Sequence, residues 1–313
     1  MRLFLFFMLI FNVIYANENL ESNLKMGGTQ GVGCVDFCVD SKILNVAFLD
    51  SDSKNTNSKK IESNKINTSV SIAPLAFFVK EIAKDRANVA IIVPQNKNPE
   101  SYEPDFNSMQ IIAKSSLIIG IGMPFEKIWI PKILNSSDNK DIKILELDKL
   151  LQNNIESHLW LSLENAEKIA NIIANTFIEI DSKNANFYKE NLANLLDSIR
   201  NLKLKIPQIL KNMPKKDFIV FHPLFEGFTQ EYGLQERSLE QHGKKYGVKD
   251  IINLANLGKE KGIKRVFSQQ NNRDMQTLAD SIKARVIVVD PLSEDYLKNL
   301  ESIITEISKS YNQ

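Results

Sequence analysis

The chain has 313 residues, of which 43% are hydrophobic and 25% are charged, and its formal net charge is +1. This length exceeds the usual size of a single hydrophobic core, so the composition predicts a soluble globular protein with two domains. The near-neutral charge, without a Lys/Arg run flanked by aromatic residues, argues against a protein that binds nucleic acid or an anionic membrane surface.

The first residues are typical of a secretory signal peptide. Arg2 is followed by an apolar run from Leu3 to Tyr15 and then by the small residue Ala16. This run is shorter than the roughly 20 apolar residues that a membrane-spanning helix needs. We therefore predict cleavage near Ala16 and export into a periplasm, with residues 1–16 removed. An uncleaved anchor is the alternative, because Ile14 stands where a small residue is preferred.

Residues 17–67 form a second segment with its own composition. They are rich in Asn, Ser, Lys and Gly and hold too few apolar side chains to bury a core, which predicts a flexible leader. Cys34 and Cys38 both lie in it. In an oxidising compartment we expect a disulfide or free thiols there rather than a metal site, because two further ligands are not close in sequence.

Strand-like and helix-like patterns alternate from residue 68 to residue 183. The apolar runs Thr68–Ile72 and Val89–Val93 predict two strands, and the runs "SLIIGIG" and "IKILELD" predict two more. Between the first two strands, one helix face carries Leu75, Phe78, Val79 and Ile82. Asp105 is a candidate N-cap for a short helix. This alternation indicates an N-terminal α/β lobe with a largely parallel sheet.

A long amphipathic helix is predicted over residues 184–212. Its apolar residues step by three and four positions and are Tyr188, Leu192, Leu195, Ile199, Leu202 and Ile206. Pro207 should kink or end this helix. Because the helix lies between two α/β patterns, we expect it to connect two lobes as a stiff strut.

The alternation returns in residues 213–313. The runs "FIVFH", "GIKRVFSQ" and "RVIVVDP" predict strands, a helix follows over about residues 273–284, and "EDYLKNLESIITEIS" predicts a final helix. The predicted fold class is therefore α/β, with two βα lobes of largely parallel sheets joined by a long rigid helix and a cleft between the lobes.

Four polar residues stand where such a fold gathers its functional groups, just beyond strands or before a helix: Glu100, His158, His222 and Asp290. Taken singly, each has an ordinary interpretation, such as a hydrogen-bonded strand end, a turn or a solvated loop charge. Two imidazoles and two carboxylates that converge between two lobes would suit a divalent transition metal.

The motifs around these residues resemble one known family. "NPESYEP" is similar to the ligand loop Pro-His-Ser/Thr-Tyr-Glu-Pro of the solute-binding proteins of zinc and manganese ABC transporters. "SHLWLSLENA" resembles their His-x-Trp-Leu-Ser-Pro-x-Asn-Ala segment, with Leu163 in place of Pro. "FIVFHPLFEGFTQEYGL" and "VIVVDPLSEDYLKNL" match two further elements. The resemblance runs in order from about Ser71 to the C-terminus.

This resemblance implies a ligand set with one departure. His158, His222 and Asp290 fall on three of the family's four metal ligands, whereas Glu100 stands where the family has His. Glu100 either keeps the site as a carboxylate ligand or marks a weakened site. The residues on both sides of Glu100 match the family motif, which favours a retained ligand. His242, expected in a surface loop, is the spare imidazole that could replace a missing one.

The implied function is that of a periplasmic receptor. It would capture Zn²⁺, with Mn²⁺ as a close alternative, and deliver it as a monomer to an inner-membrane ABC permease without bond chemistry. Zinc is favoured by the resemblance and manganese by the carboxylate-rich ligand set. One alternative is a repurposed binding protein, either an adhesin or a chelate binder, that has lost tight metal binding. An exported metal hydrolase with Glu226 as its base is another, but no His-Glu-x-x-His motif supports it.

Overall fold

The computed structural model describes residues 65–312, except for residues 138, 140, 152–157 and 241–245. The signal peptide predicted at residues 1–16, both cysteines and His242 lie outside the described residues. Nearly all of the predicted leader (17–67) does so too, but the first strand already begins at Ile66. Within the described part of the chain, no helix is both long and apolar enough to cross a membrane.

The first sheet has four parallel strands in the order β2-β1-β3-β4. Its strands are β1 (Ile66–Val70), β2 (Ala87–Ile91), β3 (Leu117–Gly120) and β4 (Lys143–Glu146). The central strand β3 is buried along its whole length, as expected for a parallel sheet covered on both faces. These four strands are the ones that the sequence predicts for the N-terminal lobe.

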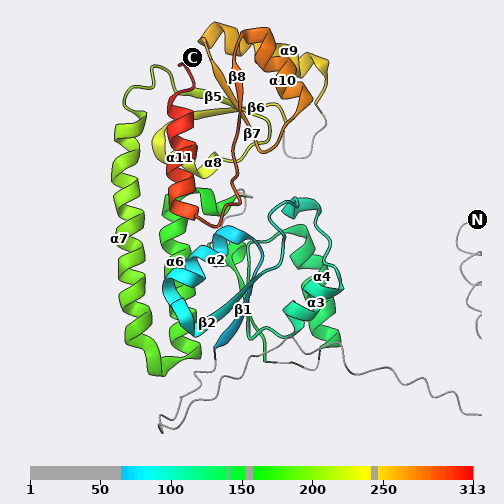
Figure 1. Cartoon of the computed structure of the whole chain (residues 1–313), viewed down its shortest axis with the longest axis vertical. Helices are drawn as coiled ribbons and strands as arrows, with labels where there is room; N and C mark the ends of the chain where they lie inside the picture. The colour runs from blue at the N-terminus through cyan, green and yellow to red at the C-terminus, as the bar shows by residue number, and fades with distance from the viewer. Residues whose placement is uncertain (1–64, 138, 140, 152–157, 241–245, 313) are drawn as a thin grey trace, which may run out of the picture. The chain divides into compact units, whose positions relative to one another are not determined.

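Helices cover both faces of this sheet (Figure 1). On one side lie α2 (Ala73–Ala83) and α6 (Leu163–Ile180), and on the other α3 (Phe106–Ala113) and α4 (Pro124–Ser136). The short elements are η1 (Lys84–Arg86), η2 (Pro99–Ser101), α5 (Leu147–Leu150), η3 (Leu159–Leu161) and η4 (Ser182–Asn184). Asp105 caps α3 as predicted, because its carboxylate accepts a hydrogen bond from Ser108 N at 2.8 Å.

The second sheet repeats the topology of the first, in the order β6-β5-β7-β8. Its strands are β5 (Asp217–Val220), β6 (Gln235–Ser238), β7 (Arg265–Ser268) and β8 (Arg285–Val288). The accompanying helices are α8 (Glu226–Tyr232), α9 (Val248–Lys261), α10 (Arg273–Ile282) and α11 (Tyr296–Ser308). Gly233 ends α8 in the left-handed conformation, at φ 64°, which a residue with a Cβ adopts only at a cost. The predicted fold class, two parallel-sheet α/β lobes, is confirmed.

The helix α7 (Ala185–Leu210) runs beside elements of both lobes (Figure 1). It packs against α2 and α6 on the N-terminal side and against α11 on the C-terminal side. Five of its six predicted apolar residues are buried, and Leu192 is partly buried. The helix continues three residues beyond Pro207, so this proline does not end it, and the observed bounds lie within the predicted range of 184–212.

The two lobes share one hydrophobic core. A continuous cluster of buried residues runs from the first sheet through α6, α7 and α11 to Phe218 and Phe267 of the second sheet. A smaller core, which includes Met275 and Leu278, lies beneath α9 and α10. At the junction, the rings of Phe77 and Phe78 pack on Tyr296 with centroid separations of 5.5 and 5.1 Å. The shared core opposes large movements between the lobes.

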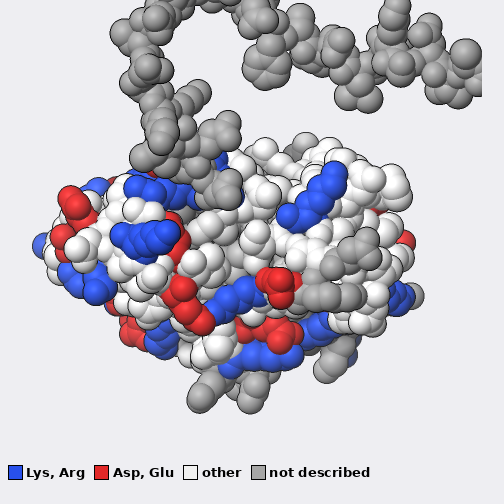
Figure 2. All heavy atoms as spheres, turned by 90° about the horizontal axis from the view of Figure 1, so that it is seen from below, with Lys and Arg blue, Asp and Glu red and all other residues white. Residues whose placement is uncertain are grey.

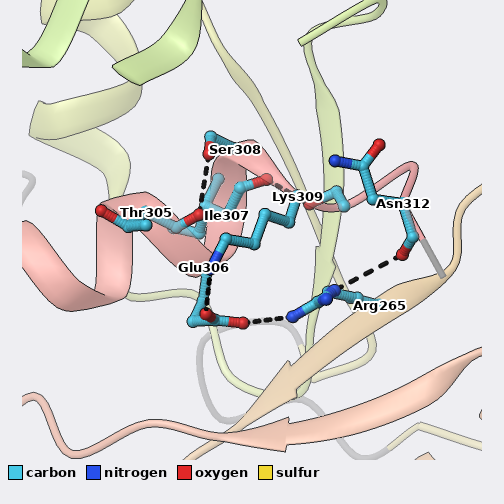
Figure 3. A network of polar contacts seen from close by, with 8 residues as sticks. Arg265, Thr305, Glu306, Ile307, Ser308, Lys309 and Asn312 are labelled. Carbon is cyan, nitrogen blue, oxygen red and sulfur yellow. Dashed lines mark hydrogen bonds and ion pairs between the residues drawn. The ribbon is translucent and has the colours of Figure 1, made fainter. Parts of the chain in front are cut away.

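The C-terminal helix is tied to the second sheet by an ion-pair network (Figure 3). Arg265 of β7 pairs with Glu306 of α11, and the same carboxylate accepts a hydrogen bond from Lys309 Nζ at 2.8 Å. Elsewhere on the surface, basic and acidic side chains are interspersed across the face shown in Figure 2. Among the described residues on that face, the basic side chains alternate with acidic ones and do not form an extended basic surface.

Candidate metal centre

The loop after β2 carries Glu100 on a buried frame. Pro99 and Pro104 are buried, whereas the side chain of Glu100 is 43% exposed. Asn98 caps the short helix η2, because its side-chain oxygen accepts a hydrogen bond from Glu100 N at 2.9 Å. The buried residues thus fix the backbone of the loop and leave the carboxylate of Glu100 directed to solvent and the cleft.

Tyr102 fastens the same loop to the first lobe. Its hydroxyl lies 2.9 Å from Ser108 Oγ of α3, and its ring meets the edge of Phe125 of α4 at a centroid separation of 5.5 Å. The aromatic residue and the prolines of "NPESYEP" therefore have structural roles. The motif has two exposed carboxylates, and Glu100 lines the cavity described below whereas Glu103 does not.

His158 enters the cleft from the segment before α6. It directly precedes η3, and only 7% of its surface is exposed. Its ring lies 5.4 Å, between centroids, from the ring of Trp160. His158 therefore packs against an aromatic ring and also lines the cleft.

The second lobe presents at least one polar residue at the carboxyl end of each of its four strands. In sheet order these residues are Glu240 after β6, His222 after β5, Ser268 at the end of β7 and Asp290 after β8. All four line one cavity of about 510 Å³, together with Glu100 and His158. This is the edge at which open α/β sheets bind their ligands.

Glu100, His158 and His222 form a compact group of possible metal ligands. Each offers one ligand atom, and these atoms lie within 4.8 Å of one another. Glu100 Oε1 is 3.5 Å from His222 Nε2. The two imidazole rings are 5.2 Å apart, between centroids, at an interplanar angle of 82°. Three of the four residues that the sequence predicted as ligands are thus brought together.

Asp290, the fourth predicted ligand, lines the same cavity but is not part of this compact group. Its carboxylate accepts a hydrogen bond from Leu292 N at 2.9 Å and a weaker one from Gln95 Nε2 at 3.4 Å. A metal held by the other three residues would bind Asp290 as well only after its carboxylate moved closer to them.

The electrostatics of the cleft centre on His222. Burial alone would lower the pKa of His222, but hydrogen bonds to Glu100 and Glu240 outweigh it and raise that pKa above its ordinary value. His222 Nδ1 lies 2.8 Å from Glu240 Oε2. The imidazole is therefore held between two carboxylates, an environment that favours a positive charge, whether a proton or a metal ion, at this place.

Sequence reasoning missed Glu240 and Glu236 because it missed β6, whose sequence "QERS" has no apolar residue. The carboxylate of Glu236 accepts a hydrogen bond from Leu224 N at 2.8 Å, which fixes the turn after His222. Burial raises the pKa of Glu236 to about 7 despite the hydrogen bonds from Leu224 N and Phe225 N. The hydrophilic character of β6 left no periodicity from which either residue could have been placed.

The donor set suits a transition metal. Two imidazole nitrogens and one carboxylate oxygen are already close together, and a second carboxylate stands at the edge of the cavity. Zinc accepts all of these donors, and manganese tolerates the same mixture when oxygen ligands are available.

Comparison with known proteins identifies the family of this chain. Residues 69–310 match the family model of the periplasmic zinc-uptake complex component A, ZnuA. The metal ABC transporter substrate-binding lipoprotein FimA of Streptococcus parasanguinis is 30% identical over 238 residues, which cover 69% of this chain and 77% of FimA. The manganese ABC transporter substrate-binding lipoprotein PsaA of Streptococcus pneumoniae is 31% identical over 198 residues, covering 58% and 64% of the two chains.

A crystal structure of ZnuA superimposes with a TM-score of 0.73 at 28% sequence identity, covering 79% of this chain and 100% of that one. The match to the family model, residues 69–310, spans both lobes and includes every residue that lines the cleft. The chain is thus a receptor and not an enzyme, and it belongs to the family of periplasmic zinc-uptake component A proteins, the substrate-binding proteins of metal ABC transporters.

Proposed function

We propose that this receptor binds one divalent metal ion between its lobes through Glu100, His158, His222 and Asp290. The proposal rests mainly on the convergence of three ligand atoms within 4.8 Å, from two lobes and three separate segments of the chain. Each of these residues follows a strand or precedes a helix, so the fold itself brings them to one edge. Asp290 becomes the fourth ligand when its carboxylate gives up the hydrogen bond from Gln95 and binds the metal.

Glu100 acts as a ligand in this proposal and does not mark a degenerate site. Its carboxylate oxygen is within reach of His222 Nε2, and the residues that frame its loop are buried and hydrogen-bonded. A site that had lost its function would have no need to keep this frame. A carboxylate also offers an oxygen that both Zn²⁺ and Mn²⁺ accept.

Zn²⁺ is the proposed cargo, with Mn²⁺ as the competitor. Two nitrogens and two oxygens can complete a tetrahedral zinc site, whereas Mn²⁺ prefers more oxygen ligands and a higher coordination number. At equal availability, affinity for such a donor set rises from Mn²⁺ to Zn²⁺. Delivery to an inner-membrane permease, a periplasmic location after removal of residues 1–16, and a monomeric state are parts of the same proposal. We also propose that the first lobe begins with β1 at Ile66 and ends at residue 183, and that residues 184–212 join it to a second lobe of residues 213–313.

Calorimetry on the mature protein, stripped of metal, tests this function. We expect sub-micromolar binding of one Zn²⁺ per chain, weaker binding of Mn²⁺, and a large loss of affinity in Glu100→Ala. Glu103→Ala, which removes an exposed carboxylate from the same loop, is the matched control and should bind as the wild type does. The proposal fails if the wild type binds neither metal with sub-micromolar affinity. Unchanged binding in Glu100→Ala would remove Glu100 from the ligand set.

A further inference from the structure

We propose that Glu240 is a positioning residue for the metal ligand His222: it holds the proton on Nδ1 and so directs the unprotonated Nε2 into the site. This inference rests on the proposed function, because it assigns a role toward the same metal. It concerns a residue that neither the sequence motifs nor the group of converging ligands includes.

The register of the second sheet brings the two residues together. Strands β5 and β6 pair in parallel with Val220 opposite Ser238. Two backbone hydrogen bonds extend this pairing beyond the strands, from Leu239 N to Val220 O at 3.1 Å and from Glu240 N to Phe221 O at 2.8 Å. Counting on by two residues sets Glu240 opposite His222. The contact between Glu240 and His222 therefore follows from the pairing of β5 with β6.

The two nitrogens of His222 face different partners. Nδ1 lies 2.8 Å from Glu240 Oε2, whereas Nε2 lies 3.5 Å from Glu100 Oε1 within the ligand group. An ionised carboxylate can only accept a hydrogen bond, so a close contact with Glu240 requires a proton on Nδ1. In the neutral imidazole, Nε2 then carries the lone pair that a metal needs.

Glu240 also restricts the orientation of the ring. The side chain of His222 is 14% exposed and that of Glu240 is 31% exposed, so the contact lies largely out of water. A carboxylate that accepts from the second nitrogen of a metal-binding histidine fixes its ring and raises its basicity, and removal of such a partner lowers metal affinity by about 10- to 100-fold. Because Glu240 engages Nδ1, it acts through His222 and is not itself one of the ligands.

The test compares four metal-free proteins: wild type, Glu240→Ala, Glu240→Gln and Glu260→Gln. The Gln variant keeps an oxygen that can accept from Nδ1 but removes the charge. Glu260→Gln makes the same charge change at an exposed site on α9 and is the matched control. The side chain of Glu240 is partly exposed, and its variants keep the backbone hydrogen bond from residue 240 to Phe221, so they should fold. Circular dichroism checks the fold of all four proteins.

Two measurements are made on each protein. Calorimetry with Zn²⁺ gives the affinity, and long-range ¹H–¹⁵N NMR of the imidazoles gives the tautomer. The chain has only three histidines, so a His242→Gln background and a His158→Asn reference assign the signals of His222. We expect Glu240→Ala to lose about 10- to 100-fold in Zn²⁺ affinity and to lose its preference for the proton on Nδ1. Glu240→Gln should keep that preference with a smaller loss of affinity, and Glu260→Gln should match the wild type.

Each result decides between the proposals. If the wild type binds Zn²⁺ and Glu240→Ala binds it within twofold of the wild type, the role of Glu240 is overturned while the metal-binding function stands. An unchanged tautomer in Glu240→Ala overturns it as well, even if affinity falls, because the residue would then act by charge alone. If the wild type binds no metal, the proposed function fails and this inference fails with it.

Discussion

Trp160 Nε1 donates a hydrogen bond to the carbonyl oxygen of Pro291 at 2.8 Å, and this contact joins the two lobes beside the cleft. Trp160 lies two residues after His158, and Pro291 directly follows Asp290. The hydroxyl of Tyr296 in turn donates to the carbonyl oxygen of Trp160. Candidate ligands from different lobes are thus linked by one small buried network, so metal binding should require only small movements.

Replacement of Trp160 by Phe should therefore affect both stability and metal binding. The variant keeps an aromatic ring but leaves the buried Pro291 carbonyl without its donor, which should cost about 1–3 kcal/mol of unfolding free energy. The same change loosens His158 relative to Asp290 and should weaken Zn²⁺ binding several-fold. Denaturant unfolding and calorimetry measure the two effects. Trp129→Phe, at a half-buried position on α4, is the control. Equal Zn²⁺ affinity in the two variants would contradict a positioning role for Trp160.

Trp160 should also report on metal binding directly. Its ring lies 5.4 Å from that of His158, between centroids, so a cation bound to His158 changes the field at the indole. In Trp129→Phe, where Trp160 is the remaining tryptophan, we expect Zn²⁺ to change the emission in a saturable way. Trp160→Phe should show no comparable change. A response carried by Trp129 would mean that the metal binds elsewhere.

Asp290 and Gln95 should have opposite effects on affinity. Asp290→Ala removes a proposed ligand and should lower Zn²⁺ affinity more than tenfold. Gln95→Ala removes a weak contact, at 3.4 Å, that competes for the same carboxylate, so affinity should stay level or rise a few-fold. Calorimetry on the two variants and the wild type tests both effects. Unchanged affinity in Asp290→Ala would show that Asp290 stays outside the metal's coordination shell.

The strands of the first sheet and the cap of α3 could be predicted from the sequence because buried segments and helix caps leave local patterns of residue types. Four apolar runs gave the first sheet, and Asp105 could be recognised as a cap from its position before a helical pattern. The helix α4 was not recognised, since Pro131 interrupts its interior and weakens the helical signal. Local pattern was therefore sufficient where a segment's own residues determine its structure.

Other features depend on contacts between distant segments, and no local pattern encodes them. β6 pairs through its backbone, so "QERS" needs no apolar residue, and the position of Glu240 opposite His222 follows from that pairing alone. The carboxylate of Asp290 accepts hydrogen bonds from Leu292 and Gln95, which belong to different lobes. The sequence indicated which residues could bind a metal, whereas their second contacts required the structure.

Glu100→His tests what the carboxylate contributes to the choice of metal. The substitution would give three imidazoles and one carboxylate, a softer donor set that favours Zn²⁺ over Mn²⁺. We expect the ratio of Zn²⁺ to Mn²⁺ affinity to rise about tenfold or more, mainly through weaker Mn²⁺ binding. Competition calorimetry with both metals measures that ratio. If it stays the same, residue 100 does not influence the selection between the two metals.

The Arg265–Glu306–Lys309 network should make stability depend on pH (Figure 3). The hydrogen bond from Lys309, reinforced by its charge and that of Arg265, outweighs burial and lowers the pKa of Glu306. Because the pKa is lower in the folded than in the unfolded chain, the stabilisation is fully present above the unfolded value. It is lost as the pH falls through the folded value.

Glu306→Gln should therefore lower the unfolding free energy by about 1 kcal/mol at neutral pH, and the difference should vanish in acid. Glu301→Gln is the matched control on the same helix. Glu301 pairs with Lys205, whose side chain is 59% exposed, so its loss should change stability little. Denaturant unfolding of the three proteins across the acid range measures both effects. A deficit in Glu306→Gln that persisted at low pH would show that the side chain stabilises the helix end by packing and not by its charge.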